Sequence, residues 1–218
     1  MSDLTKRDLP DLSSAERGKP SYFSEVIPTD FEVPFKKPEE PIGDSAELDG
    51  YVDSKFAEIK AYTDFIINKF EELLVSHGWA DAKAAYKVML GVLREALNNA
   101  IYHGNFGVRV TEDGQNLLDL GKQAVKLKLI SDSNLSKEQR ERMPSKAVEV
   151  FVEVSDNDIL IEIKDSGEGF DWKNSTDPTD EEHILGLKNR GVFLMKQVFK
   201  ATFNDKGNEV KLEKTKGA

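Results

Sequence analysis

Two strand patterns separated by a short polar turn limit the folds that are open to this sequence. Residues 147–154 and 159–163 alternate apolar and polar side chains, which is the two-residue period of a strand with one buried face. The turn between them is Ser-Asp-Asn-Asp, and these residue types are typical of tight turns. The pattern therefore predicts a β-hairpin.

Three helices and a second hairpin are predicted around this pair of strands. Over residues 45–77 apolar side chains recur every three or four positions, which places them on one helical stripe. A second stripe runs over residues 88–101, with Asp81 as a candidate N-cap. Residues 186–200 predict a third helix, and residues 201–212 predict a closing hairpin. The combination indicates one domain that contains both helices and strands.

Less regular segments lie before and between these elements. Residues 1–28 mix proline, serine and charged residues without a sustained period, and predict a flexible tail. Residues 29–35 alternate at the strand period, with Pro34 favouring an edge strand. Residues 106–146 show only a short strand pattern at 124–129 and predict a surface insertion, which either binds a partner or is a tolerated loop.

The charge balance and the hydropathy exclude several classes of function. The chain has 40 acidic and 30 basic residues and a formal charge of -10, so we expect no direct binding to nucleic acid, which needs a basic face. It has no cysteine and therefore neither a disulfide framework nor a cysteine nucleophile. No apolar run approaches the roughly 20 residues of a membrane span, and the N-terminus lacks the apolar core of a signal peptide. The expected location is the cytoplasm, away from membranes.

Polar side chains gather near the end of the second predicted helix. Glu95, Asn99 and His103 are four residues apart and lie along one helical face, with Asn98 beside them. Adjacent asparagines are unfavourable inside a helix, because their side chains compete for backbone hydrogen bonds. One interpretation is a solvated polar face. The other is a catalytic pair, in which Asn99 holds Mg²⁺ beside phosphates and Glu95 orients or deprotonates a nucleophile.

Two glycine-containing segments follow later in the chain. Asp165 comes directly after a buried strand and precedes Gly167 and Gly169. This is either a simple turn or a site where a carboxylate accepts a hydrogen bond from an exocyclic amine while a flat base lies against glycine backbone. In residues 186–195, glycine and the cations Lys188 and Arg190 open an amphipathic helix. This is either an ordinary helix start or a seat for phosphate oxygens.

In this order the three segments resemble the sequence boxes of the GHKL nucleotide-binding superfamily, and most closely its branch of small anti-sigma-factor serine kinases. Residues 93–105 resemble the N box, residues 165–170 the first glycine box and residues 190–195 the second. The likeness extends over residues 29–214 and implies an α+β fold. That fold is the Bergerat two-layer α/β sandwich, whose mixed, mostly antiparallel sheet is covered by helices on one face. The chain departs from the branch at Asn189, where a glycine is usual.

The resemblance implies that the cofactors are ATP and Mg²⁺. It makes Glu95 the general base, Asn99 the Mg²⁺ ligand and Asp165 the contact to adenine. The other residues that it places around the base or the phosphates are Asn98, His103, Gly167, Gly169, Phe170, Arg190 and Gly191.

The resemblance implies a homodimeric serine/threonine kinase that phosphorylates a small antagonist protein of the anti-anti-sigma type and sequesters a sigma factor. The alternative is a regulatory module that binds a nucleotide or a partner without turnover, which Asn189 and the insertion favour. The catalytic domain of a histidine kinase is a weaker match, because no upstream helix carries an evident phospho-acceptor histidine. His77 lies at the end of the first predicted helix and is interpreted as a capping or surface residue.

Overall fold

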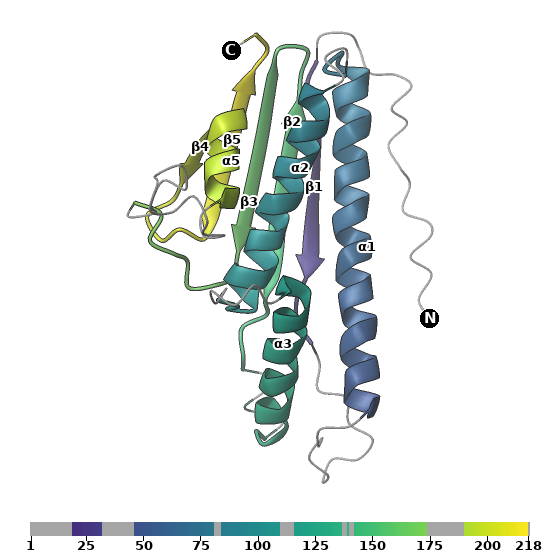
Figure 1. Cartoon of the computed structure of the whole chain (residues 1–218), viewed down its shortest axis with the longest axis vertical. Helices are drawn as coiled ribbons and strands as arrows, with labels where there is room; N and C mark the ends of the chain where they lie inside the picture. Colours follow the sequence, from purple (N-terminus) through teal and green to yellow (C-terminus); the bar gives the residue numbers. More distant parts are fainter. Residues whose placement is uncertain are drawn as a thin grey trace.

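A computed structural model describes residues 19–31, 46–80, 84–109, 116–136, 139, 142–173 and 190–217. In this part of the chain helices cover one face of a five-stranded sheet with the order β1-β2-β3-β5-β4, and all strand pairs in it are antiparallel (Figure 1). The strands are β1 (Ser21–Pro28), β2 (Ala147–Val154), β3 (Asp158–Asp165), β4 (Lys200–Phe203) and β5 (Glu209–Thr215). The helices are α1 (Ala46–Ser76), α2 (Ala85–Asn98), the π-helix η2 (Asn99–Asn105), α3 (Leu117–Ser133) and α5 (Arg190–Val198). The α+β two-layer fold is thereby confirmed.

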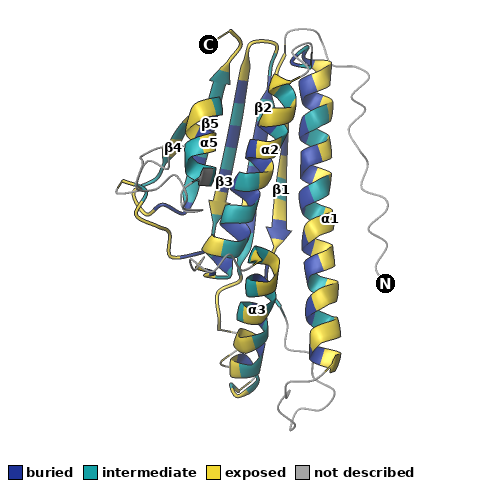
Figure 2. Cartoon of the chain, in the orientation of Figure 1, coloured by how far each residue is buried: buried dark blue, intermediate teal, exposed yellow. Residues whose placement is uncertain are grey.

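The core lies between the sheet and the helices that cover it. Alternate residues of β2 and β3 are buried, and the stripes of α1 and α2 pack against them (Figure 2). Fully burying one of these aliphatic side chains contributes roughly 1.5–3 kcal/mol relative to leaving it exposed. Both predicted hairpins are confirmed, and the register of the first pairs Val154 with Ile159 and Val148 with Asp165. Asp165 therefore lies at the opposite end of the sheet from the turn.

The N-terminal strand begins earlier than the sequence predicts. Residues 21–28 form β1, whereas the sequence predicts a flexible tail there, and residues 29–31 do not continue the strand. The predicted strand at 29–35 is therefore wrong for its described part. Residues 1–18 lie outside the part of the chain that the structure describes.

Tertiary partners explain why this strand is hidden in the sequence. Only Phe23 and Ile27 of β1 are buried apolar residues, while the polar residues Ser21 and Glu25 alternate with them. Glu25 forms a salt bridge of 2.7 Å with Lys69 of α1. Polar residues that find partners on a covering helix interrupt the apolar alternation from which a strand is recognised.

His77 is buried, which corrects its interpretation as a capping or surface residue. Its ring is hydrogen bonded through Nδ1 to the Asp156 carboxylate at 2.7 Å and through Nε2 to the Ser21 hydroxyl at 3.0 Å. Nearby, the Trp79 indole N–H donates to the Ser155 carbonyl at 2.8 Å. These bonds join the end of α1 to β1 and to the β2–β3 turn.

The strand pattern predicted at residues 124–129 is wrong, because this segment lies within α3. The buried positions of α3 include Gly121, Val125 and Leu129, which are four residues apart, whereas Leu127 is 69% exposed. Lysines at positions 126 and 128 imitate a strand here, although Lys128 pairs with Asp132 of the same helix and other lysines of α3 reach acidic residues of α1. Lys126 bonds to Asp49, and Lys122 bonds to Asp53 at 2.7 Å.

The two helices α1 and α3 form a second, smaller core below the sheet (Figure 1). At 1.5 Å per residue, α1 with 31 residues is roughly 46 Å long, whereas an eight-residue strand spans roughly 26 Å. The overhanging part of α1 therefore needs another cover, which α3 supplies. Part of the predicted insertion at 106–146 is thus a helix packed on a core, and not a surface loop.

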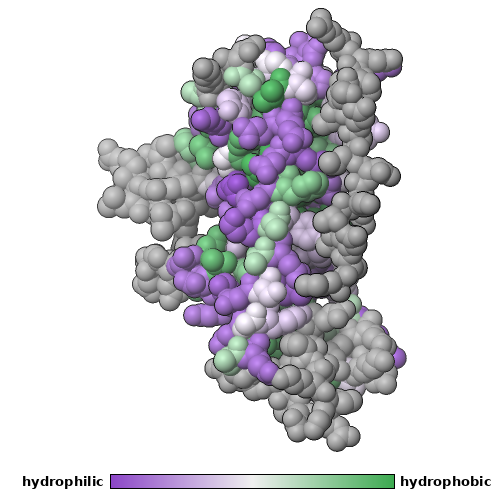
Figure 3. All heavy atoms as spheres, turned by 90° about the vertical axis from the view of Figure 1, so that its right-hand side faces the viewer, coloured by the Kyte–Doolittle hydropathy of each residue, from purple (hydrophilic) through white to green (hydrophobic). Residues whose placement is uncertain are grey.

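Seen from the side of α1, the described surface is mostly hydrophilic, with scattered apolar residues (Figure 3). Within the described residues, no helix is both long enough and apolar enough to cross a membrane.

We predict that alanine at Gly121 destabilises the protein although it favours the helical conformation. A Cβ at this position would lie 2.7 Å from the Tyr102 ring and 3.2 Å from the Phe56 ring, so Gly121→Ala should lower the free energy of unfolding by about 1–3 kcal/mol. Gly91→Ala is the matched control, because Gly91 lies in α2 with no atom within 4 Å of such a Cβ, and should stabilise by about 0.5–1 kcal/mol. Urea unfolding of both variants tests the packing, and equal stabilisation would contradict it.

Candidate functional site

A cleft of about 1010 Å³ lies between the helical layer and the end of the sheet that carries Asp165. Its walls come from α2 and η2, from the loop after β3, from the start of α5 and from the β4–β5 turn. The polar and charged side chains that line it are those of Glu95, Asn99, His103, Arg109, Lys146, Asp165, Ser166, Glu168, Asp171, Asn208 and Glu209.

The helix that carries the N box changes its geometry at the cleft. The C-cap of α2 is the first residue of the π-helix η2, and the Phe106 N–H donates to the Ile101 carbonyl, which is an i→i+5 bond. Wide π turns inside helices are frequent at functional sites. Glu95, Asn99 and His103 all line the cleft, as their spacing predicts, whereas Asn98 does not.

His103 is held in one tautomer by the chain that follows η2. Its Nδ1 lies 2.6 Å from the Val108 carbonyl oxygen, and because a carbonyl can only accept, Nδ1 carries the proton and donates it. Nε2 is then an acceptor in the neutral imidazole. The side chain is exposed and lines the mouth of the cleft.

The first turn of α5 lies against the N box. A Cβ on Gly191 would clash with the Glu95 carboxylate and would lie 2.9 Å from the Asn99 amide nitrogen. Glycine at this position therefore lets the start of α5 approach Glu95 and Asn99. The side chain of Arg190 and residues 174–189, which include Lys188 and Asn189, are outside the described part of the chain.

Asp165 is the half-buried carboxylate on the opposite wall. Burial raises the pKa of Asp165 above its ordinary value of 3.8, and the Gly167 N–H, Lys206 and Lys146 oppose that rise. The Gly167 N–H donates to Asp165 Oδ1 at 2.8 Å, which leaves the second carboxylate oxygen available as an acceptor. A partly desolvated carboxylate that lines a cleft can bind a group with an N–H donor.

Two close glycine contacts hold the loop after β3 in place. A Cβ on Gly167 would clash with the Gly104 carbonyl, and a Cβ on Gly104 would clash with the Asp165 carboxylate. Farther along, Gly169 and Gly207 have positive φ angles of 81° and 77°, where other residues are strained, and a Cβ on them would clash with the backbone of Lys206 and of Phe170 respectively. The two glycines of the predicted box are therefore required by backbone contacts as well as by any ligand.

The β4–β5 turn contributes to the site although its sequence indicates only a hairpin. The Asn208 side-chain amide donates to the Asp165 carbonyl at 2.8 Å, and the Asp165 N–H donates to the Asn208 carbonyl at 2.9 Å. Asn208 is buried and lines the cleft. No residue pattern distinguishes it from an ordinary turn residue, because its role arises from the pairing of β3 with β5.

Aromatic rings form the wall next to this turn. Phe170 and Phe203 both line the cleft and meet edge to face, with 5.5 Å between their ring centroids. Trp172 stacks on Phe203 at 5.7 Å, and its indole N–H donates to the Asn204 carbonyl at 2.8 Å. Phe170 thus lies where the sequence places it, and Phe203 is an addition from the structure.

Within the described residues, no group of three or more His, Asp or Glu side chains could hold a metal ion by itself. Mg²⁺ differs from zinc in this respect, because it keeps several waters and is commonly bound by one or two protein oxygens together with phosphates. The Asn99 side-chain oxygen is one such donor in the cleft. The donor set fits a Mg²⁺ ion that enters with a nucleotide.

A family model of the histidine kinase-like ATPase domain matches residues 60–214. The chain belongs to this family. The matched region covers more than half of the chain and includes the whole lining of the cleft. A comparison with curated proteins finds no match. The predicted GHKL-type superfamily is confirmed, and the domain is of an ATP-binding type, while the anti-sigma kinase branch stays a prediction.

The raised pKa of Asp165 predicts a measurable effect of pH on stability. Between pH 3.8 and the higher pKa of the folded state the native protein binds the proton more tightly, so stability falls as pH rises through this window. Asp165→Asn removes that loss and can still accept from the Gly167 N–H. It should therefore unfold at a higher urea concentration at pH 7, with the difference from the wild type disappearing below pH 3.8.

Asp205→Asn on the β4–β5 turn is the control, because the Asp205 side chain is 99% exposed and the change should stay within about 0.5 kcal/mol. An Asp165→Asn variant that is less stable than the wild type at pH 7 would contradict the predicted cost of burial.

Proposed function

We propose that this domain binds Mg-ATP in the cleft and transfers the γ-phosphoryl group to a serine or threonine of a small antagonist protein, as anti-sigma-type kinases do. The observation that carries the proposal is the contact of Gly191 with both Glu95 and Asn99. It brings a carboxylate and an amide to the start of a helix, while Asp165 lines the same cleft.

The base is proposed to bind at the wall formed by Asp165. The free oxygen of its carboxylate is suited to accept a hydrogen bond from the exocyclic amine of adenine. The buried backbone of Gly167 presents no side chain, so a flat ring can lie against the loop. Phe170 and Phe203 supply apolar surface beside it. A base with a carbonyl in place of the amine would meet a carboxylate that cannot donate to it.

The phosphates are proposed to lie between the start of α5 and the N box. The N-terminal N–H groups of a helix attract phosphate oxygens, and Arg190 and His103 are further candidate contacts. Asn99 would hold Mg²⁺ through its amide oxygen. When bound, Mg²⁺ neutralises charge on the phosphate oxygens.

Glu95 is proposed as the general base. It lines the cleft beside Asn99 and is only partly exposed. In the reaction the hydroxyl oxygen of the protein substrate bonds to the γ-phosphorus, the bond to the oxygen of ADP breaks, and Glu95 takes the hydroxyl proton. Such a step depends mainly on positioning, which a carboxylate held against Gly191 can provide.

The assembly and location of the protein belong to the same proposal. The expected partners are the antagonist and a sigma factor, the expected form is a homodimer in the cytoplasm, and direct contact with nucleic acid or membranes is not expected. A nucleotide-binding module without turnover is the second candidate, which the replacement of glycine by Asn189 favours. Fold alone does not separate the two, because many activities share one fold.

Calorimetric titration with ATP and ADP, with and without Mg²⁺, tests the binding site. The wild type should bind ATP with micromolar affinity, and Asp165→Asn should weaken binding about 10- to 100-fold, because hydrogen bonds to charged groups contribute about 1.5–3 kcal/mol. Asp205→Asn is again the control. Equal affinity of wild type and Asp165→Asn would show that the base does not depend on this carboxylate.

Transfer of ³²P from ATP to a co-encoded antagonist protein tests Glu95. Glu95→Gln should bind ATP like the wild type and lower the rate of transfer about 10²- to 10⁴-fold, as loss of a general base does. Stoichiometric binding of the antagonist without any phosphorylated product would instead establish the module without turnover.

Gly191→Ala tests the contact between α5 and the N box. The added methyl group should displace Glu95 and Asn99 and weaken Mg-ATP binding more than binding of adenosine, because only the phosphate side is disturbed. Gly91→Ala, whose methyl group meets no atom within 4 Å, should bind both as the wild type does. An equal loss for adenosine would contradict this placement of the phosphates.

A further inference from the structure

We propose that Asn105 is a positioning residue, which holds the loop after β3 in the place where Asp165 can bind the base. The proposal rests on the proposed function, because it assumes that this loop binds the base opposite Glu95 and Asn99. Asn105 is the last residue of η2 and is 1% exposed. It does not line the cleft, so any effect on a nucleotide must pass through the residues that it holds.

Three bonds from Asn105 reach three different segments. Its Oδ1 accepts from the Ser166 N–H at 2.7 Å, and its Nδ2 donates to the Thr29 hydroxyl at 2.8 Å. Its backbone carbonyl accepts from the Lys146 ammonium group, also at 2.7 Å. The end of η2 is thereby joined to the loop after β3, to the end of β1 and to the segment before β2.

The bond to Ser166 is the one that matters for the nucleotide. Ser166 stands between Asp165 and Gly167, so its N–H fixes the backbone from which the base-binding carboxylate projects. The Ser166 hydroxyl also bonds to the backbone of Ala147 at the start of β2. A partly buried hydrogen bond that loses its acceptor is costly, and the loop would shift to find another partner for the Ser166 N–H.

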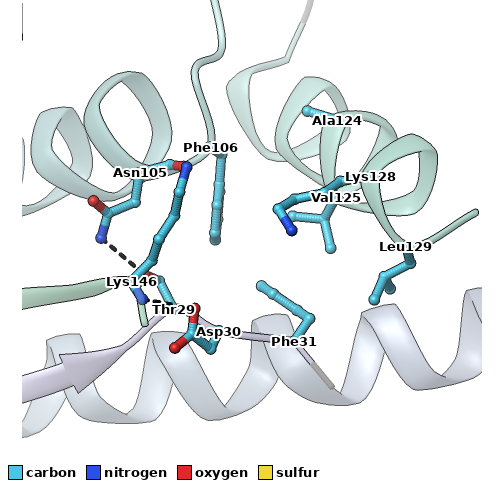
Figure 4. Close-up of a pocket in the computed structure, with 10 residues that line it drawn as sticks. All are labelled: Thr29, Asp30, Phe31, Asn105, Phe106, Ala124, Val125, Lys128, Leu129 and Lys146. Atoms are coloured by element: carbon cyan, nitrogen blue, oxygen red, sulfur yellow. Dashed lines mark hydrogen bonds between the residues drawn. The ribbon is translucent and has the colours of Figure 1, made fainter. Parts of the chain in front are cut away.

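Lys146 holds the end of η2, and its charge opposes the rise that burial causes in the pKa of Asp165. The Lys146 side chain lines the cleft and also a smaller cavity of about 100 Å³, which lies between Asn105, Phe106 and α3. Figure 4 shows its ammonium group beside Asn105, above the cavity that Phe31 and Leu129 close on the other side. The cavity borders Asn105, so shortening that side chain removes the bond to Ser166 without a neighbour that replaces it. The loss should therefore appear as misplacement of Asp165.

The arrangement makes a prediction that separates the two halves of the site. Glu95 on α2 and Asn99 at the first position of η2 lie against the start of α5, whereas the backbone next to Asp165 is bonded to Asn105 at the other end of η2. Asn105→Ala should therefore weaken adenosine and Mg-ATP by the same factor, about five- to tenfold for one lost hydrogen bond. The increase in ATP affinity on adding Mg²⁺ should remain as in the wild type.

Two further variants distinguish positioning from general stability. Asn105→Asp keeps an acceptor for the Ser166 N–H and can accept from the Thr29 hydroxyl, so it should restore most of the adenosine affinity. Thr29→Val removes the second bond of the Asn105 side chain and should lower the unfolding midpoint while leaving adenosine affinity unchanged. Loss of adenosine affinity in Thr29→Val equal to that in Asn105→Ala, or no loss in Asn105→Ala, would overturn the proposal.

Amide hydrogen exchange of the nucleotide-free protein, measured by NMR, completes the test. The Ser166 amide should exchange at least tenfold faster in Asn105→Ala than in the wild type and in Asn105→Asp. If the wild type binds no nucleotide, the proposed function fails. The exchange rate of the Ser166 amide then tests by itself whether Asn105 positions the loop after β3. An unchanged Ser166 exchange rate would exclude the positioning role, whether or not ATP binds.

Discussion

The cleft depends on the contact between the end of the N-box helix and the loop after β3. A Cβ on Gly167 would clash with the Gly104 carbonyl, and a Cβ on Gly104 would clash with the Asp165 carboxylate. The contact brings the polar face of α2 and the end of the sheet together. A wider π turn at the end of the helix, with buried Asn105 as its last residue, accompanies this approach.

Burial of Asp165 illustrates how stability and binding oppose each other in this domain. The carboxylate is partly removed from water, which raises its pKa, and the Gly167 N–H with Lys146 and Lys206 keeps the charged form accessible. The partly desolvated charge of Asp165 lowers the stability of the free protein, and a ligand that donates a hydrogen bond to the carboxylate offsets this cost. That cost explains why the loop needs several supports, among them Asn208 on the β4–β5 turn.

The second core, which lies between α1 and α3, also depends on contacts between residues that are far apart in the chain. Rings of Phe31, Phe56, Tyr102 and Phe106 are in contact between α1, η2 and the end of β1, and Phe106 also lines the cleft. The sequence predicts a surface insertion in this region, because its only regular pattern is the short strand-like alternation at 124–129. The ion pairs of Lys122 and Lys126 with α1 are long-range contacts, and no local pattern contains them.

Residue patterns alone establish the two hairpins, the helices α1 and α2 and the three segments that carry Glu95, Asn99, Asp165 and Gly191, because strand and helix periods and glycine positions are local properties. The tertiary structure decides the rest. It places Ser21 and Glu25 in a strand through partners on or beside α1, and it turns Asn208 and Asn105 into supports of the site. These roles arise from contacts between residues far apart in the chain, where side-chain identity is informative only after the neighbours are known.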